Sequence, residues 1–118
     1  MDSKELLQII VEAADNKRAE DITALDVEGV SLLADYFVIM DASSQRQVQA
    51  IAENVEEQVE KAGYDVQNVE GKGGSSWILL DLGDIVVHVF QKETREFYNL
   101  EKLWADAKKV DLTDWVKE

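Results

Sequence analysis

Apolar and polar residues recur along the chain with two different periods, and the clearest pattern is a β-hairpin followed by a helix. Residues 77–82 and 85–90 are apolar runs separated only by Gly83-Asp84, and a glycine that leads a two-residue loop is typical of a tight hairpin. Thr94 then stands where it could cap a helix. Apolar residues follow at intervals of three or four, namely Phe97, Leu100, Trp104 and Ala107. We therefore expect this helix to pack back on the hairpin.

Before the hairpin, the pattern predicts two longer helices and three strands. A stripe of apolar residues between Leu6 and Ala14 indicates an N-terminal helix. A second stripe follows Ser44, which has Gln47 at the spacing of a capping box, and Gly63 is a typical helix stop. Strands are expected at residues 22–28, 36–40 and 64–70, with a helical turn at 30–35 and a glycine-rich loop at 71–76.

These elements predict an α/β fold, a single layered domain with a mixed five-stranded sheet flanked by helices. A helix joins the strands at 36–40 and 64–70, and a right-handed crossover within one sheet is the natural connection between them. The hairpin adds antiparallel strands. We assign residues 1–108 to the domain and residues 109–118 to a C-terminal tail. The tail carries scattered apolar residues, which leave open whether it docks on the domain or stays loose.

The excess of acidic residues indicates which class of macromolecule the protein can bind. The 118 residues include 25 acidic and 12 basic side chains, for a net charge of −13. Such a chain repels the phosphate backbone of nucleic acid and attracts a basic protein surface. The absence of cysteine excludes disulfides and thiolate chemistry, and no apolar run approaches the ~20 residues that span a membrane. We therefore expect a cytoplasmic protein that binds a basic protein.

Large aromatic side chains are concentrated in the hairpin and in the helix after it. They are interleaved with charged residues and lie at positions Trp77, Phe90, Phe97, Tyr98 and Trp104. A hairpin and one helix enclose little interior, so some of these rings are expected to face outward, where Trp, Tyr and Arg form protein-binding hot spots. The alternative is that all of them belong to the core, because aromatic side chains bury large apolar areas.

Two patterns suggest catalysis, and each has a simpler interpretation. Ser43-Ser44 at a strand-to-helix turn, followed later by Asp81 and Asp84, suggests a nucleotidyltransferase-like site in which carboxylates hold two metal ions. However, Gly83-Asp84 has the composition of a turn. His88, the only histidine, could serve a Ser-His-Asp hydrolase or a metal site, or could be a buried, hydrogen-bonded core residue.

Three further patterns can be explained by structure alone, without a functional role. Residues 71–74 could form a phosphate-binding loop, but they precede a strand and not a helix. The glutamates of the second helix are typical of a solvated face. Arg95 and Glu96, at the start of the last helix, are interpreted as an exposed surface pair unless they contact a partner.

Several separate blocks of sequence together carry a family resemblance. They are Asp35-Tyr36-Phe37-Val38-Ile39, Glu70-Gly71, residues 77–80, residues 83–90, Arg95-Glu96-Phe97-Tyr98, Leu100-Glu101 and Leu103-Trp104. In these blocks, and in their order, the chain resembles the ribosomal silencing factor (RsfS, Iojap-like) family. The resemblance covers residues 6–104. The chain departs from the family pattern at Asp41-Ala42-Ser43, where a glycine-containing turn is expected, and at Leu82, where an aromatic residue is common.

The resemblance implies a non-enzymatic factor that needs no cofactor. Such a factor binds the large ribosomal subunit through its fourteenth protein, a basic component of an intersubunit bridge, and blocks joining of the small subunit. Translation then falls when nutrients are short. The resemblance also implies a nucleotidyltransferase-like fold that lacks the catalytic acids, and a capacity to form homodimers. Carried over by motif, the residues expected to form or support the partner contact are Trp77, Arg95, Tyr98, Leu100, Glu101 and Trp104.

Overall fold

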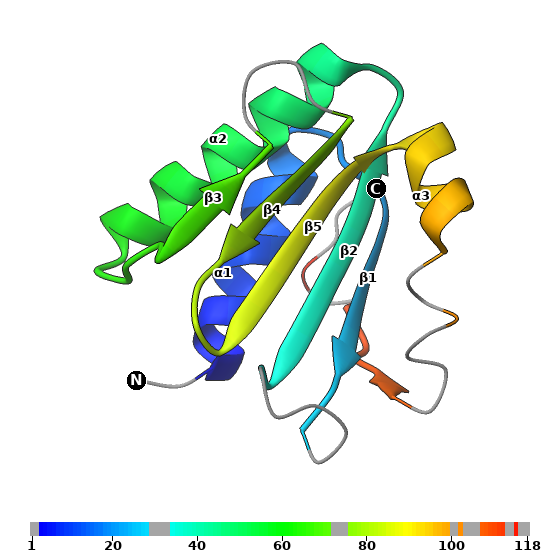
Figure 1. Ribbon diagram of the computed structural model, residues 1–118. Coiled ribbons are helices and arrows are strands. Elements are labelled where there is room, and N and C mark those ends of the chain that lie inside the picture. Colours follow the sequence, from blue (N-terminus) through cyan, green and yellow to red (C-terminus); the bar gives the residue numbers. More distant parts are fainter. Residues whose placement is uncertain are drawn as a thin grey trace.

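The computed structural model describes residues 3–28, 34–71, 76–99, 102, 107–112 and 115. Its helices and strands, in chain order, are α1 Ser3–Asn16, β1 Glu20–Asp26, β2 Tyr36–Ala42, α2 Gln45–Lys61, β3 Asn68–Glu70, β4 Trp77–Asp81, β5 Ile85–Gln91, α3 Lys92–Tyr98 and β6 Lys108–Lys109. The long helices α1 and α2 lie together on one face of the sheet, and the short α3 lies near β1 and β2 (Figure 1). The mixed α/β class predicted from the sequence is confirmed.

Local sequence signals explain where the two long helices run. The apolar stripe of α1 is buried, with Leu7, Ile10 and Val11 fully enclosed. The α2 helix starts at Ser44, whose hydroxyl accepts a hydrogen bond from the backbone N of Gln47 at 3.2 Å. Its buried residues follow the predicted stripe, and the chain leaves it beyond Ala62 through Gly63. Among the described helices none has the length and apolar content needed to cross a membrane.

The predicted hairpin is β4 and β5. The backbone N of Leu82 donates to the carbonyl of Ile85 at 3.0 Å, which closes a loop of Gly83 and Asp84. Gly83 has a φ of +88°, and a Cβ there would lie 2.7 Å from the Gln67 side chain. The positive φ favours glycine at this position, whereas the exposed Gln67 side chain is flexible and could move aside for a Cβ. The hairpin register places Trp77 directly opposite Phe90.

Within the described residues the sheet has six strands and not the predicted five, in the order β3-β4-β5-β2-β1-β6. The central strands β2 and β5 are parallel, and the other neighbours are antiparallel. The additional strand, β6, consists of two lysines, which have no alternation of apolar and polar residues for a pattern to detect. As predicted, β2 and β3 belong to one sheet, but β4 and β5 lie between them.

The C-terminal residues that the structure describes dock on the domain. The predicted boundary at residue 108 falls inside β6, which pairs with β1. Val110 donates its backbone N–H to the carbonyl of Ala24 at 2.8 Å. Leu112 is 8% exposed, and Trp115 packs against the same core.

Other predicted boundaries shift or fall outside the described residues. The strand predicted at 22–28 begins at Glu20, and the strand predicted at 64–70 shortens to Asn68–Glu70. Of the helical turn predicted at 30–35, only residues 34 and 35 are described, and neither is helical. Residues 72–75 of the predicted glycine-rich loop are also outside the described part.

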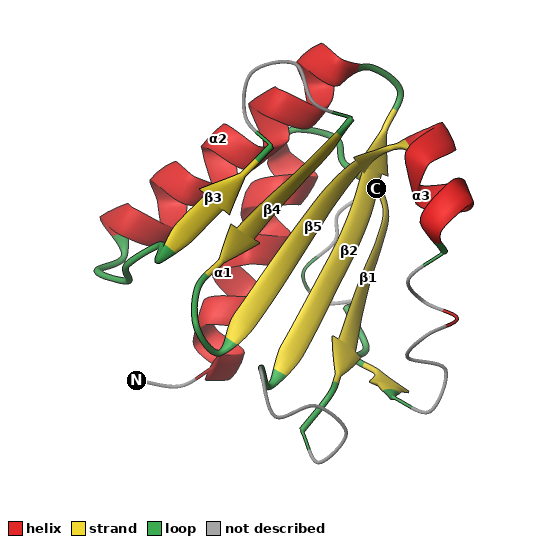
Figure 2. Ribbon diagram, in the orientation of Figure 1, coloured by secondary structure: helices red, strands yellow, loops and turns green. Residues whose placement is uncertain are grey.

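Apolar clusters form on both faces of the sheet. One cluster joins α1 and α2 to inward residues such as Val38, Met40 and Val87. Alternate strand residues, including Phe37, Ile39 and Phe90, form a second cluster on the opposite face, with Trp77 packed against it. Figure 2 shows both long helices behind the strands, so they leave this second face uncovered. The second face therefore carries Trp77 and Phe90, two of the aromatic residues singled out in the sequence.

Candidate functional site

Neighbouring rings lie in contact on the second face of the sheet, and we call five of them the aromatic cluster: Trp77, His88, Phe90, Phe97 and Tyr98. Phe37 also contacts His88, at a centroid distance of 5.8 Å. The ring of Trp77 is at the centre of the cluster, with centroid distances of 4.9 Å to Phe90 and to Tyr98 and 5.9 Å to His88. Phe97 joins through Tyr98 at 5.2 Å. The cluster thus connects β4, β5 and α3.

A hydrogen bond fixes the indole of Trp77 against the sheet. Its Nε1 donates to Nδ1 of His88 at 3.2 Å. His88 is 6% exposed, and burial lowers its pKa from 6.5 to about 4, because a charged imidazole loses its hydration there. The neutral ring keeps an acceptor for the indole at neutral pH. The interpretation of His88 as a buried, hydrogen-bonded core residue is confirmed.

Exposure rises across the aromatic cluster from the sheet to α3. Phe90 is fully buried, Trp77 is half-buried, and Tyr98 and Phe97 are 48% and 81% exposed. The prediction that some rings face outward is therefore confirmed. Phe97 and Tyr98 are also in contact with each other, and exposed apolar side chains that adjoin one another mark candidate interaction sites.

The last helix differs from its prediction. It begins at Lys92, directly after β5, so Thr94 lies within the helix and caps nothing, and Asn99 ends it in the left-handed conformation. The predicted packing of Phe97 on the hairpin was wrong, since Tyr98 makes that contact. Of the other predicted site residues, Leu100, Glu101 and Trp104 lie outside the described residues.

Arg95 is the inward-facing residue of α3. It is 6% exposed, so its interpretation as an exposed surface pair was wrong. Its Nη1 donates to Oδ2 of Asp41 at 3.0 Å and to the carbonyl of Asp21 at 2.6 Å, and its Nη2 donates to the hydroxyl of Thr23 at 3.2 Å. Tyr98 is one turn further along the helix, on the same side. Arg95 therefore holds α3 where Tyr98 meets Trp77.

Asp41, the partner of Arg95, was missed because the strand was expected to end at residue 40. The strand continues to Ala42. Asp41 follows Phe37 and Ile39 at every second position, so its side chain projects from the same face of the sheet. It is 4% exposed, and burial raises its pKa although Arg95 offsets part of this. The alternation of residues 37, 39 and 41 was the signal that could have placed Asp41 on the aromatic face.

The residues considered for a nucleotidyltransferase site lie at opposite ends of the sheet. Ser43 and Ser44 follow the end of β2, whereas Asp81 and Asp84 flank the turn that leads into β5, which is parallel to β2. Oδ1 of Asp81 accepts from the backbone N of Gly83 at 2.9 Å, a turn contact. The interpretation that joins these residues in one site was wrong. Within the described ranges, no three His, Cys, Asp or Glu side chains form a metal-binding group.

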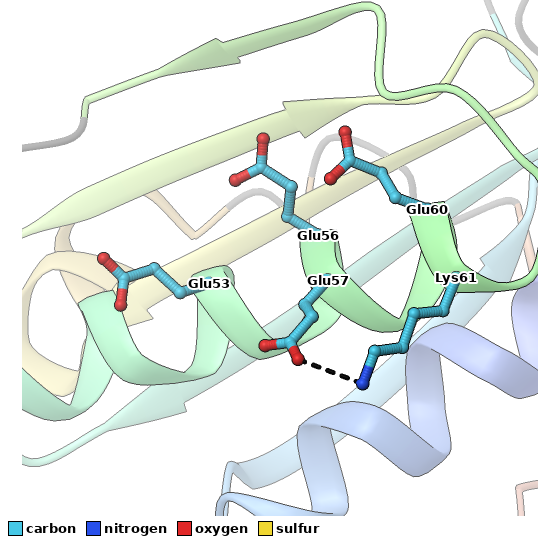
Figure 3. A pocket seen from close by; sticks show the side chains of 5 residues that line it. All are labelled: Glu53, Glu56, Glu57, Glu60 and Lys61. Atoms are coloured by element: carbon cyan, nitrogen blue, oxygen red, sulfur yellow. Dashed lines mark ion pairs between the residues drawn. The ribbon is translucent and has the colours of Figure 1, made fainter.

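The glutamates of α2 form an exposed or half-buried row on the side of the molecule away from the aromatic cluster. Figure 3 shows them along a hollow lined by Glu53, Glu56, Glu57, Glu60 and Lys61. Lys61 pairs with Glu57 at 3.2 Å, and both side chains are well exposed. A single exposed pair at this helical spacing contributes little, about 0.3 to 0.5 kcal/mol. The row fits the solvated helix face predicted from the sequence.

A second hollow adjoins the aromatic cluster at the β3 edge of the sheet. It has a volume of about 260 Å³ and is lined by Glu70, Gly71, Trp77 and Leu79. From the sequence, Glu70 was predicted to end a strand and Gly71 to begin a loop, with no site assigned to either. The three side chains come together because Glu70 is opposite Leu79 in the register of β3 and β4.

Comparisons with known proteins agree on one family. The family model described as ribosomal silencing factor during starvation matches residues 1–118. The chain is 54% identical over 112 residues to the ribosomal silencing factor RsfS of Bacillus subtilis, covering 95% of each chain. It is 36% identical over 103 residues to the chloroplastic protein Iojap of Zea mays, covering 87% of this chain and 45% of that protein.

Solved structures share the fold of this chain. A crystal structure of a protein from Chromobacterium violaceum superposes with a TM-score of 0.87 at 33% identity and covers 89% of this chain and 88% of that one. One from Bacillus halodurans gives 0.83 at 46% identity and covers 92% and 99%. With a family model that matches from the first residue to the last, this chain belongs to the ribosomal silencing factor (RsfS) family.

Proposed function

We propose that this member of the family binds the large ribosomal subunit through its fourteenth protein, a basic bridge component, and thereby blocks joining of the small subunit. Translation is lowered in this way when nutrients are short. The aromatic cluster is the contact surface. Trp77 and Tyr98 contact the partner, Arg95 supports them from inside, and Leu100, Glu101 and Trp104 are proposed to complete the contact.

The observation that carries this proposal is the pair of exposed rings, Tyr98 at 48% and Phe97 at 81%, beside the half-buried Trp77. Partly exposed Trp and Tyr side chains that are held in place are typical of hot spots in protein interfaces. The net charge of −13 favours a basic partner. The family membership supplies the ribosome as the setting for that partner.

Occupancy alone would produce silencing. An interface of ~800 Å² per partner is enough for stable binding, and a surface that holds this protein cannot also hold the small subunit. The proposal therefore requires no turnover and no cofactor, and it locates the protein in the cytoplasm, where the subunits meet. A homodimer, which the family resemblance also suggests, would have to expose this surface before it could bind.

Sedimentation of purified ribosomal subunits tests the proposal. Wild-type protein should bind the large subunit and reduce formation of joined ribosomes. Trp77→Ala should weaken this binding about thirtyfold, since loss of a central hot spot costs about 2 kcal/mol or more. Glu60→Ala, on the opposite side of the molecule, is the matched control and should behave like wild type. Equal binding by Trp77→Ala and wild type would contradict the proposal.

A further inference from the structure

The hollow beside the aromatic cluster combines one carboxylate with two apolar walls. Glu70 and Leu79 are paired across β3 and β4, and Trp77 precedes Leu79 by two residues on the same strand. Because side chains on one face of a strand recur every second residue, all three project from the same face of the sheet. They line a volume of about 260 Å³. Small-molecule sites are typically ~300 to 1,000 Å³, so this hollow has the size for a single long side chain.

The apolar walls present no hydrogen-bond donor. The indole N–H of Trp77 is already donated to His88 at 3.2 Å, and Leu79 has no polar side-chain atom. Both walls are half-buried. They can pack against a hydrocarbon stem but cannot bind an anionic head group.

The rim of the hollow carries a negative charge, the carboxylate of Glu70. Glu70 is exposed, and its carboxylate makes no hydrogen bond or ion pair with the residues that the structure describes. An apolar occupant would strip water from this carboxylate without replacing its hydrogen bonds, which is unfavourable. A cationic head group would replace them. Lysine and arginine combine such a head group with an apolar stem.

We propose that this hollow receives one lysine or arginine side chain of the protein partner, with the stem against Trp77 and Leu79 and the cation on Glu70. This rests on the proposed function, because it specifies how the same surface selects a basic partner. It also assigns Glu70 a role in specificity that differs from that of the rings. Trp77 contributes contact area, whereas Glu70 rejects a partner that offers no cation at this point.

Binding of purified large subunits to wild type, Glu70→Gln and Glu70→Lys, at two salt concentrations and constant magnesium, tests this inference. Glu70→Gln keeps the size of the side chain and should weaken binding about tenfold at low salt, with a smaller salt dependence than wild type. Glu70→Lys should weaken binding further through repulsion. The matched controls are Glu60→Gln and Glu60→Lys, which make the same changes in charge on an exposed glutamate of α2 and should stay within about twofold of wild type.

The outcomes separate this inference from the proposed function. If Trp77→Ala weakens binding but both Glu70 variants bind like wild type, the hollow takes no cation and only this inference is overturned. Equal losses for the Glu70 and Glu60 variants would also overturn it, because net charge alone would then explain the effect. If Trp77→Ala also binds like wild type, the proposed function itself is overturned. Far-UV circular dichroism confirms that each variant is folded before its binding is compared.

Discussion

At the scale of single residues, Trp77 belongs to two environments. Its N–H reaches the buried His88, while its ring contacts Tyr98 at the surface. Its importance was predictable because a tryptophan at the start of a hairpin strand is conspicuous in the sequence. The burial of Arg95 was not predictable, since an arginine in a short helix is normally solvated. Only the contacts with Asp41 and Thr23 reveal why it points inward.

The depressed pKa of His88 predicts how stability depends on pH. The unfolded chain binds a proton near the ordinary value of 6.5, whereas the folded chain does so only at about 4. The contribution of His88 is therefore fully present above pH 6.5 and is lost as the pH falls toward 4. We expect the free energy of unfolding to fall by up to about 1.4 kcal/mol per pH unit in this range on account of His88.

Urea denaturation at pH 7, 6 and 5 measures this effect, with His88→Gln as the comparison. Gln retains an acceptor for the indole but does not titrate in this range. The carboxylates titrate in both proteins, so the difference between their slopes isolates His88. Identical pH slopes for the two proteins would show that His88 is not responsible.

At the scale of elements, α3 depends on its tertiary contacts. It has seven residues, its N-cap Gln91 makes no side-chain capping bond, and isolated helices of this length are unstable in water. The hairpin and α2 were predictable because strong local signals define them, the glycine of the turn and the capping serine. The start of α3 was not predictable from the sequence, because the position of this helix is set by the contact between Arg95 and Asp41, which are far apart in the chain.

Removing the Arg95 side chain should therefore lower the stability of the folded protein. Arg95→Ala leaves the carboxylate of Asp41 buried without its charge partner, and we expect a loss of about 3 to 5 kcal/mol in the free energy of unfolding. Chemical denaturation measures this loss. Asp41→Leu combined with Arg95→Met, which replaces the pair by apolar side chains, should recover a substantial part of it. If the double variant is as unstable as the sum of the single variants, the buried pair is not the cause.

At the scale of the whole molecule, the sheet separates two different surfaces. One face is covered by α1 and α2, with the glutamates of α2 on the outside, and the other carries the aromatic cluster. The layered α/β class and the membership of both crossover strands in one sheet followed from the order of the elements. The docking of the C-terminal segment could not be predicted in this way, because apolar residues such as Leu112 and Trp115 are too widely spaced there to form a periodic pattern.

Leu112→Ala tests whether this segment is part of the folded domain. The side chain is 8% exposed within the core between the sheet and the long helices. Its truncation should cost about 2 to 3 kcal/mol and lower the melting temperature by several degrees. Thermal unfolding measures the shift, and Lys109→Ala, at an exposed position of β6, is the control. An unchanged melting temperature for Leu112→Ala would show that the segment contributes no stability.

The outermost strands of the described sheet are very short, three residues in β3 and two in β6. A strand at the border of a sheet offers unpaired backbone groups on which another chain can extend the ladder, and short strands offer few of them. β3 and β6 themselves therefore give a second chain few backbone groups on which to extend the sheet, although β6 pairs with only Leu25 and Asp26 of β1. At these two strands, contact with a partner depends mainly on side chains, whose shape and charge can discriminate one partner from another.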